Sequence, residues 1–340
     1  MEQLRVEKTG GVGIFDLHCD TLDLLALHDA AGQMGVDLSN KDGTPKRLDS
    51  LAENDAHIDL SRMLGVTGAW CQCFACFIPD GLGPDLSWQV FTTVRDFFFQ
   101  QAGEHGELIE QVRDARDIRR ITGEGRCAGM FTVEGGSFLE EGSLDRLYEA
   151  ADAGVKMLTL TWNGRNAIGS GNQTDEGLSD FGREVVRAME DCRMVVDVSH
   201  ANDRTFWDVA EVATRPFAAS HSNSRAVCDH PRNLTDDQFR AIAERGGIVG
   251  LNFCCDFLRE DCTDATRDDV LRHVDHWLNL DGEHVVALGS DYDGSTVPSW
   301  LDPAEKVVEL YGLFSREFGA EVAQEICFEN ACSFFERNEG

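Results

Sequence analysis

The chain has 340 residues, 42% of them hydrophobic, which is enough for a large domain with a buried core. Its 61 acidic and 30 basic residues give a net charge of −31 at pH 7. A surface this acidic repels phosphate groups, so we expect neither nucleic acid nor an anionic membrane surface as a partner.

No segment resembles a signal for export or membrane attachment. The first residues, MEQLRVEKTGGVG, lack the apolar core of a signal peptide, and the last, FERNEG, carry no lipid-anchor signal. The longest nearly apolar run, residues 246–255, is too short to span a bilayer. We therefore expect a cytoplasmic protein whose 12 cysteines are reduced thiols.

Eight short apolar, β-rich runs recur along the chain, and most of the segments between them have helical periodicity. The runs are residues 12–17, 68–78, 127–133, 156–162, 194–199, 216–220, 246–253 and 284–290. Strands that alternate with helices pair in parallel, and eight repeats indicate an α/β fold of the closed (β/α)8 TIM barrel type. No linker or repeat divides the chain, so we expect one domain over residues 1–340, with residues 301–340 as closing helices.

Three of the intervening segments carry helix-start signals. They are 179–192 with Ser179 as the cap, 235–247 with Thr235 and Gln238 in capping-box spacing, and 266–280 with Thr266 and Asp269 in the same spacing. The stretch from Ala30 to Ala56 is polar and contains glycine, which predicts a long loop or short helices after the first strand.

Metal-binding and acid/base side chains recur where the apolar runs end. Five of the runs lead into such residues, which are His18, Asp20, Glu134, His200, His221 and Asp291. In a (β/α)8 barrel the carboxyl ends of the strands form the active-site face, so these side chains would meet in one cavity. Any one of them alone is more often a helix cap or a satisfied polar group; their recurrence at five strand ends indicates a site.

The composition of this group suits divalent metal ions. Three imidazoles with aspartate and glutamate are typical of zinc or a similar ion. His18 and Asp20 are two positions apart and project to the same side of a strand, so both can serve one ion. Five ligands exceed the needs of one tetrahedral site, which favours two ions that share a carboxylate, clamp a water and polarise a carbonyl. Asp291 is then free to transfer protons.

Other kinds of site have weaker support. A Ser-His-Asp hydrolase is disfavoured because the chain has no G-x-S-x-G nucleophile elbow. His221 in the Ser-rich segment 220–224 is better explained as a metal ligand than as a member of a catalytic triad. GEGRCAG and GSGN lack the lysine of a phosphate-binding loop. Cys71, Cys73 and Cys76 have no second Cys-rich knuckle, and strand alternation would point them to different faces, so we interpret them as buried apolar side chains.

These segments together resemble the membrane (renal-type) dipeptidase family of the amidohydrolase superfamily, peptidase family M19. The resemblance runs in order from about residue 14 to about residue 335 and is carried by IFDLHCDTLDLL, HIDLSRMLGVTGAWCQCF, MFTVEGGSFL, VKMLTLTWN, VVDVSH, PFAASHSNSRAVCDHPRNLTDD and HVVALGSDYDG. It implies a (β/α)8 barrel with two Zn²⁺ ions per chain and a small dipeptide as substrate.

The resemblance also implies how the two ions are held. His18, Asp20 and Glu134 would hold one ion, and Glu134, His200 and His221 would hold the other, so that Glu134 bridges them. A water between the ions would then attack the scissile amide.

Further positions would contact the substrate. Asp291 matches the acid/base residue that carries a proton to the leaving amine, and Arg232 matches the residue that binds the substrate's C-terminal carboxylate. Trp162, Asn163 and Cys254 would line the substrate pocket. Trp162 stands where well-studied members have a histidine that contacts the developing oxyanion, and Cys254 where many have a tyrosine. The metal ligands are intact, so hydrolysis is expected, while the oxyanion contact and the substrate preference stay open; we expect Trp162 to narrow the pocket.

The sequence thus favours a zinc-dependent dipeptidase acting on unblocked dipeptides, with a D-residue at the C-terminal side as one option. Two alternatives remain, namely another dinuclear metal amidohydrolase of the N-acyl amino acid hydrolase type, and a non-catalytic descendant that binds metal or peptides. Animal members are lipid-anchored outside the cell; this chain resembles the cytoplasmic bacterial relatives. The oligomeric state is not decided by the sequence, and a homodimer is one option.

Overall fold

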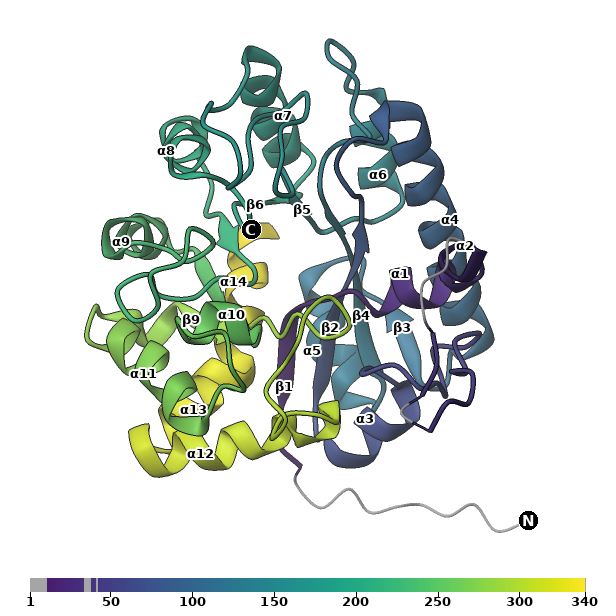
Figure 1. The fold of residues 1–340 in the computed structure, drawn as a ribbon, viewed down its shortest axis with the longest axis vertical. Coiled ribbons are helices and arrows are strands. Elements are labelled where there is room, and N and C mark those ends of the chain that lie inside the picture. The colour runs from purple at the N-terminus through teal and green to yellow at the C-terminus, as the bar shows by residue number, and fades with distance from the viewer. Residues whose placement is uncertain (1–10, 34–37, 41, 340) are drawn as a thin grey trace.

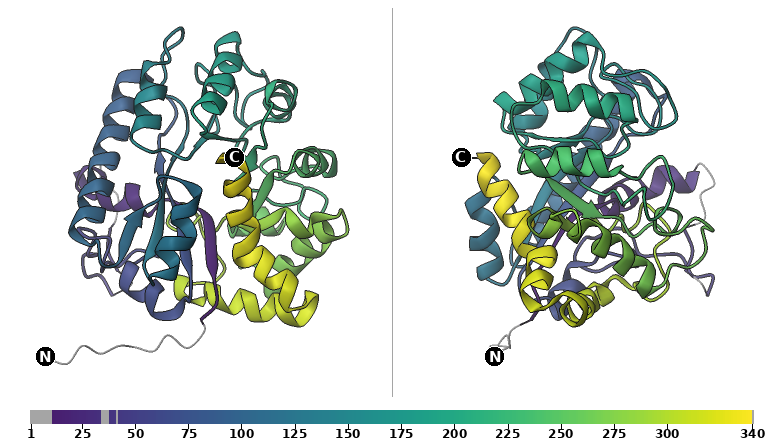
Figure 2. Two further views of the ribbon diagram at one scale, coloured as in Figure 1. Left: turned by 180° about the vertical axis from the view of Figure 1, so that it is seen from behind. Right: turned by 90° about the vertical axis from the view of Figure 1, so that its left-hand side faces the viewer.

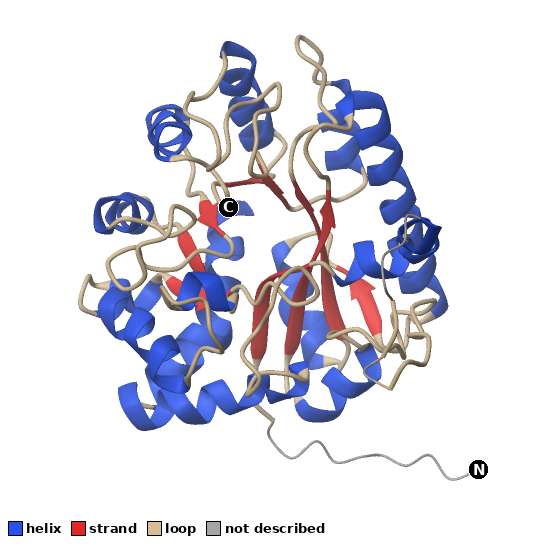
Figure 3. Ribbon diagram, in the orientation of Figure 1, coloured by secondary structure: helices blue, strands red, loops and turns tan. Residues whose placement is uncertain are grey.

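Nine parallel strands form the central sheet in a computed structural model that describes residues 11–33, 38–40 and 42–339 (Figure 1 and Figure 3). They are β1 (Ile14–Cys19), β2 (Trp70–Phe77), β3 (Ile109–Gln111), β4 (Cys127–Glu134), β5 (Met157–Thr159), β6 (Val195–Asp197), β7 (Ala218–Ala219), β8 (Ile248–Leu251) and β9 (Val286–Leu288). Neighbours follow the order β2-β1-β9-β8-β7-β6-β5-β4, and β2 pairs with β4 to close the ring. Eight strands therefore form a closed barrel, and the predicted (β/α)8 fold is confirmed.

The ninth strand, β3, lies outside the barrel and does not correspond to any of the eight predicted runs. It pairs with the first residues of β4, where Ile109 lies opposite Cys127. β4 pairs with β5 only through its last two residues, Val133 and Glu134, so β3 covers the amino-terminal part of that edge. A strand of three residues is too short for a periodic pattern, which is why the sequence does not predict it.

Helices surround the barrel (Figure 1 and Figure 2). The α-helices are α1 (Thr21–Ala26), α2 (His28–Gln33), α3 (Leu60–Val66), α4 (Gly83–Glu104), α5 (Ala115–Gly123), α6 (Asp145–Asp152), α7 (Asp180–Asp191), α8 (Asp203–Val212), α9 (Asp236–Glu244), α10 (Cys255–Leu258), α11 (Arg267–Leu278), α12 (Val308–Phe318), α13 (Ala320–Gln324) and α14 (Asn330–Glu339), and shorter helical turns lie at Gly282–His284, Ala304–Val307 and Glu325–Glu329. The predicted caps are present: Ser179 accepts from Gly182 N, and Thr235 and Thr266 each form a capping box. None of the described helices is long and apolar enough to cross a membrane.

The barrel interior is apolar and is closed at its amino-terminal end by α14 (Figure 2, left). Phe335 of α14 stacks on Phe15 of β1, with ring centroids 5.7 Å apart. Cys71 and Cys73 pack in this interior cluster, whereas Cys76 packs in the cluster between barrel and helices. The cysteines therefore alternate along β2 as expected for buried apolar side chains, and the carboxyl end of the barrel is left for a functional site.

Two predictions fall partly outside the described residues. The absence of a signal peptide rests mainly on residues 1–10, and the polar stretch 30–56 includes residues 34–37 and 41, none of which the structure describes. The described part of that stretch contains the end of α2 and otherwise irregular backbone, in agreement with the prediction.

Candidate metal centre

Six of the predicted side chains meet at the carboxyl end of the barrel. His18 lies in β1 and Glu134 ends β4, and the four others follow a strand by one to three residues, namely Asp20 after β1, His200 after β6, His221 after β7 and Asp291 after β9. All six are buried, with at most 9% of each residue exposed. The strand ends bring together residues that are far apart in the sequence, such as His18 and Asp291, which are separated by 273 positions.

The carboxylate of Glu134 lies between two groups of candidate ligands. Its Oε2 is 3.6 Å from His18 Nε2, and that nitrogen is 3.4 Å from Asp20 Oδ2. Its Oε1 is 2.6 Å from His200 Nε2 and 3.5 Å from His221 Nε2, and these two nitrogens are 3.0 Å apart. Each oxygen of Glu134 therefore faces a different ligand group, and the carboxylate lies within reach of both.

The polar atoms in this cluster fit bound cations. His18 Nε2 and Asp20 Oδ1 are buried without a hydrogen-bond partner. Burial, helped by the charge of Arg232, lowers the pKa of His200 to about 4, whereas the carboxylates of Asp20 and Glu134 outweigh burial and raise the pKa of His18 to about 10. A histidine that binds a metal must be neutral, so a cation bound beside His18 would take the place of a proton. Nitrogen and carboxylate donors in this ratio suit zinc or a similar divalent ion. Within the described residues, no cysteine joins a group compact enough to hold a metal.

Two buried aspartates inside the strands fix the loops that carry the ligands. Asp197 of β6 accepts hydrogen bonds from Ser220 N at 2.9 Å and Ser220 Oγ at 2.5 Å, and Ser220 Oγ lies 2.7 Å from His221 Nδ1. Asp16 of β1 likewise accepts from Ser290 N at 2.7 Å and Ser290 Oγ at 2.6 Å, in the loop after β9. Neither role was predicted from the sequence, although a carboxylate within an apolar strand is a signal for such a role.

Asp291 is held at the barrel mouth by its backbone conformation and by a side-chain hydrogen bond. Its backbone adopts φ 63°, and that of His200 adopts φ 65°, a left-handed conformation that non-glycine residues adopt mainly where the surrounding structure requires it. Asn252 Nδ2 donates to Asp291 Oδ2 at 3.0 Å. Burial, with the charges of Asp20 and Glu134 adding to it, raises the pKa of Asp291 to about 7. A carboxyl group in this range can both accept and release a proton near neutral pH.

Arg232 lies beside the candidate metal centre, in the loop after β7. It is 5% exposed, its Nη2 donates to the carbonyl of His221 at 3.2 Å, and its guanidinium lies 5.2 Å from the ring centroid of Phe257. Its Nε is buried without a partner. A buried guanidinium with an unused donor is suited to an anionic ligand.

The other three predicted pocket residues have different contacts. The half-buried ring of Trp162 lies 6.4 Å from that of His200 and edge-on to Phe77 at 5.0 Å, so it borders the metal centre. Asn163 Oδ1 is 3.0 Å from His200 Nδ1, which orients a candidate ligand from the side remote from the metal. Cys254 is buried, and burial together with Asp291 raises the pKa of its thiol to about 12.

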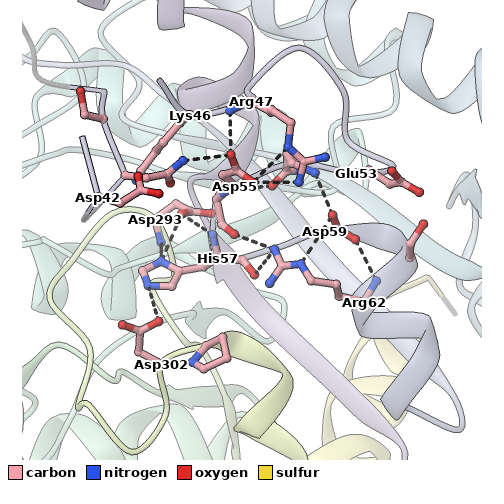
Figure 4. Close-up of a pocket in the computed structure, with 16 residues that line it drawn as sticks. Asp42, Lys46, Arg47, Glu53, Asp55, His57, Asp59, Arg62, Asp293 and Asp302 are labelled. Atoms are coloured by element: carbon pink, nitrogen blue, oxygen red, sulfur yellow. Dashed lines mark hydrogen bonds and ion pairs between the residues drawn. The ribbon is translucent and has the colours of Figure 1, made fainter. Parts of the chain in front are cut away.

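A surface hollow of about 870 Å³ lies next to this centre and is separate from it (Figure 4). None of the six candidate residues lines it, and Figure 4 shows His57 at its edge between Asp293 and Asp302. Asp293 accepts from His57 N at 2.8 Å and from Thr21 Oγ1 at 2.5 Å. Because Thr21 follows Asp20, Asp293 ties the ends of β1 and β9 together. The hollow is lined mainly by residues between 39 and 62, with Asp293, Asp302 and Pro303 from the loop after β9.

Two solved structures are similar to this chain over almost its whole length. A metallopeptidase from Rhodobacter sphaeroides, liganded with a phosphinate mimic of the dipeptide L-Ala-D-Ala, has a TM-score of 0.85 at 26% identity and covers 96% of this chain and 99% of that one. A structure described as dipeptidase AC, a metallopeptidase of family M19, has a TM-score of 0.84 at 29% identity and covers 96% of this chain and 98% of that one.

Curated relatives and the family profile agree with these structures. An uncharacterized protein from the pqqA 5′ region of Klebsiella pneumoniae is 38% identical over 229 residues, which is 64% of this chain and 82% of that protein. An uncharacterized dipeptidase of Schizosaccharomyces pombe is 32% identical over 277 residues, 75% of this chain and 65% of its own length, so this chain spans less than two thirds of the yeast protein. The profile of the membrane dipeptidase family matches residues 11–339. The chain therefore belongs to the membrane dipeptidase family, peptidase family M19, and is a metallo-dipeptidase.

Proposed function

We propose that the protein hydrolyses the peptide bond of unblocked dipeptides at a centre of two zinc ions. The observation that carries the proposal is the position of Glu134, with Oε2 toward His18 and Oε1 toward His200 and His221. His18 and Asp20 would hold one ion. His200 and His221 would hold the second ion, and Glu134 would bind both ions. Two divalent ions bound there would polarise the scissile carbonyl and lower the pKa of a nearby water.

The residues of the chain would supply proton transfer and substrate orientation. Asp291 would accept a proton from the attacking water while the water oxygen bonds to the carbonyl carbon of the substrate. The same carboxyl would then give that proton to the amine nitrogen as the C–N bond breaks. Asn252 would keep Asp291 aligned, and Arg232 would bind the C-terminal carboxylate of the substrate through paired N–H donors. Trp162 would limit the side chains that fit beside His200.

The substrate range is tested with a panel of L-L and L-D dipeptides beside N-acyl amino acids, assayed with zinc supplied. The L-D dipeptides are included because the Rhodobacter sphaeroides relative is liganded with a mimic of L-Ala-D-Ala. We expect turnover of free dipeptides. Turnover of the N-acyl amino acids alone would favour the alternative amidohydrolase, and no turnover with metal bound would favour a binding protein. We also propose a cytoplasmic location, which the unpaired thiols of the 12 cysteines support.

The metal stoichiometry is a separate prediction. We expect elemental analysis of the zinc-loaded protein to give two ions per chain, and Glu134→Ala to lower the content of both because its two oxygens face both ligand groups. His284→Ala is a matched control, since His284 is an exposed imidazole remote from the barrel mouth. One ion or none in the loaded protein would contradict the dinuclear centre.

A further inference from the structure

A fully buried carboxylate lies behind the imidazole of His221. Asp197 ends β6 and Ser220 follows β7, and neither of these residues nor His221 is exposed to solvent. Ser220 Oγ is 2.5 Å from Asp197 Oδ2 and 2.7 Å from His221 Nδ1. The other ring nitrogen, Nε2, lies 3.5 Å from Glu134 Oε1 and 3.0 Å from His200 Nε2. The hydroxyl of Ser220 therefore connects the carboxylate to the side of the ring that points away from the candidate metal centre.

Asp197 accepts a hydrogen bond at each of its acceptor positions. Its Oδ1 accepts from two backbone N–H groups, those of Ser199 at 3.0 Å and Ser220 at 2.9 Å. Its Oδ2 accepts from two hydroxyls, Thr159 Oγ1 at 2.6 Å and Ser220 Oγ at 2.5 Å. An ionised carboxylate has about four acceptor positions, and O–H donors lie about 2.5–2.7 Å from its oxygens. These contacts are those of a charged carboxylate to which Ser220 donates its one hydroxyl hydrogen.

The direction of that hydrogen bond decides which nitrogen of His221 carries a hydrogen. Because the hydroxyl hydrogen of Ser220 is used on Asp197, Ser220 Oγ is left to accept from His221 Nδ1. A neutral imidazole carries one N–H, so a hydrogen at Nδ1 leaves the lone pair of Nε2 free. A metal ion needs this free lone pair, and metal-bound histidines usually donate their other N–H to a neighbouring group.

The same pair of a carboxylate and a serine occurs a second time without an imidazole behind it. Asp16 accepts from Ser290 N at 2.7 Å and from Ser290 Oγ at 2.6 Å. Among the described residues, the Ser290 hydroxyl then contacts the carbonyl of His18 at 3.0 Å and not an imidazole nitrogen. Asp16 is thus a matched control for Asp197, since it is buried in a strand and lies close in sequence to another candidate ligand.

We propose that Asp197, acting through Ser220, is a positioning residue that holds His221 in its Nδ1–H tautomer and so keeps Nε2 open to a metal ion. This inference rests on the proposed dinuclear centre and deepens it by assigning the residues that prepare one ligand for binding. The hydrogen bond of Nδ1 toward a carboxylate also makes Nε2 a stronger donor to a cation. His200 has an uncharged partner instead, because its Nδ1 lies 3.0 Å from the amide oxygen of Asn163.

Asp197→Asn would reverse the direction of these hydrogen bonds with little change in shape. The backbone N–H groups of Ser199 and Ser220 can only donate, so the new amide oxygen must occupy the Oδ1 position. The amide NH₂ then faces Ser220 Oγ and donates to it. The nearer acceptor left for the Ser220 hydroxyl is His221 Nδ1, at 2.7 Å against 3.2 Å for Ser199 Oγ. A hydroxyl that donates to Nδ1 places the ring hydrogen on Nε2, where it blocks a metal ion.

The test compares Asp197→Asn with Asp16→Asn. Zinc dissociation constants are measured by competition with a chelator, starting from the zinc-loaded proteins. We expect Asp197→Asn to bind one of its two ions on the order of 10- to 100-fold more weakly than Asp16→Asn does, the usual cost of removing a hydrogen-bond partner of a metal-bound histidine. Nitrogen NMR of isotope-labelled histidine side chains, at a zinc concentration that saturates the wild type, should show the Nε2–H form of His221 in Asp197→Asn only.

Equal zinc affinities in the two variants would overturn the inference, because both carboxylates would then only hold loops in place. An Nδ1–H tautomer retained in Asp197→Asn would overturn it as well. If Asp197→Asn does not fold, Ser220→Ala decides by the same affinity measurement, and it should bind one ion more weakly than Ser290→Ala does. A wild-type protein that binds no zinc, or binds it without hydrolysing dipeptides, would instead contradict the proposed function.

Discussion

Replacing Asp291 by asparagine is expected to lower kcat for dipeptides on the order of 10²–10⁴-fold, the usual contribution of a general acid/base group. Asparagine has nearly the same shape, and its carbonyl oxygen can still accept the hydrogen bond from Asn252, but it cannot take up the proton of a water. The two ions should stay bound, because the proposed ligands are untouched. Steady-state kinetics and elemental analysis of the same preparation measure both effects.

The metal content decides between two roles for Asp291. His18, Asp20 and Asp291 carry oxygen and nitrogen atoms within 4.8 Å of one another, so the geometry also permits Asp291 to bind a metal. Loss of an ion together with activity would make it a ligand, and activity within a few-fold of wild type would remove it from catalysis. Asp281→Asn is the matched control, since Asp281 also adopts a left-handed backbone, φ 60°, but is exposed and remote from the site.

The barrel was predictable because its strands are buried on both faces and its helices begin with local signals. Residues 14–17 of the run VGIFDL lie in β1, are all buried and are apolar apart from Asp16, and Thr235 with Gln238 forms the capping box at the start of α9. These features depend on neighbouring residues, so the sequence displays them directly. β3 depends on its pairing with β4 and leaves no pattern of its own.

The candidate ligands were also predictable, because each lies at the end of a strand that the sequence displays. The residues that form hydrogen bonds with these ligands were not predictable. His221 follows β7, so its place at the barrel mouth follows from strand polarity alone. The contacts of Asn163 with His200 and of Asp197 with Ser220 depend on loop paths and strand register between distant segments. The resemblance alone predicts Asn163 in the substrate pocket, and its hydrogen bond to the candidate ligand His200 could not be predicted from the sequence.

Arg232→Ala is expected to lower kcat/KM for free dipeptides on the order of 10²–10³-fold, mainly through KM, because truncating one partner of a buried charge pair leaves the other unpaired. Dipeptides amidated at the C-terminus should lose far less, since they have no carboxylate to bind. Arg232→Lys should recover only part of the loss, because an ammonium keeps the charge but not the paired donors of the guanidinium.

The comparison of free and amidated substrates separates recognition from a structural role. Arg232 also donates to the His221 carbonyl, so its removal could displace a candidate metal ligand. Such a displacement would slow both substrates equally and would lower the metal content. Arg245→Ala is the matched control, since Arg245 also lies over an aromatic ring, that of Phe217, and donates to backbone carbonyls, but at the outer surface of the barrel. The ratio of free to amidated turnover should fall with Arg232→Ala and stay unchanged with Arg245→Ala; equal losses for both substrates would place Arg232 outside the recognition site.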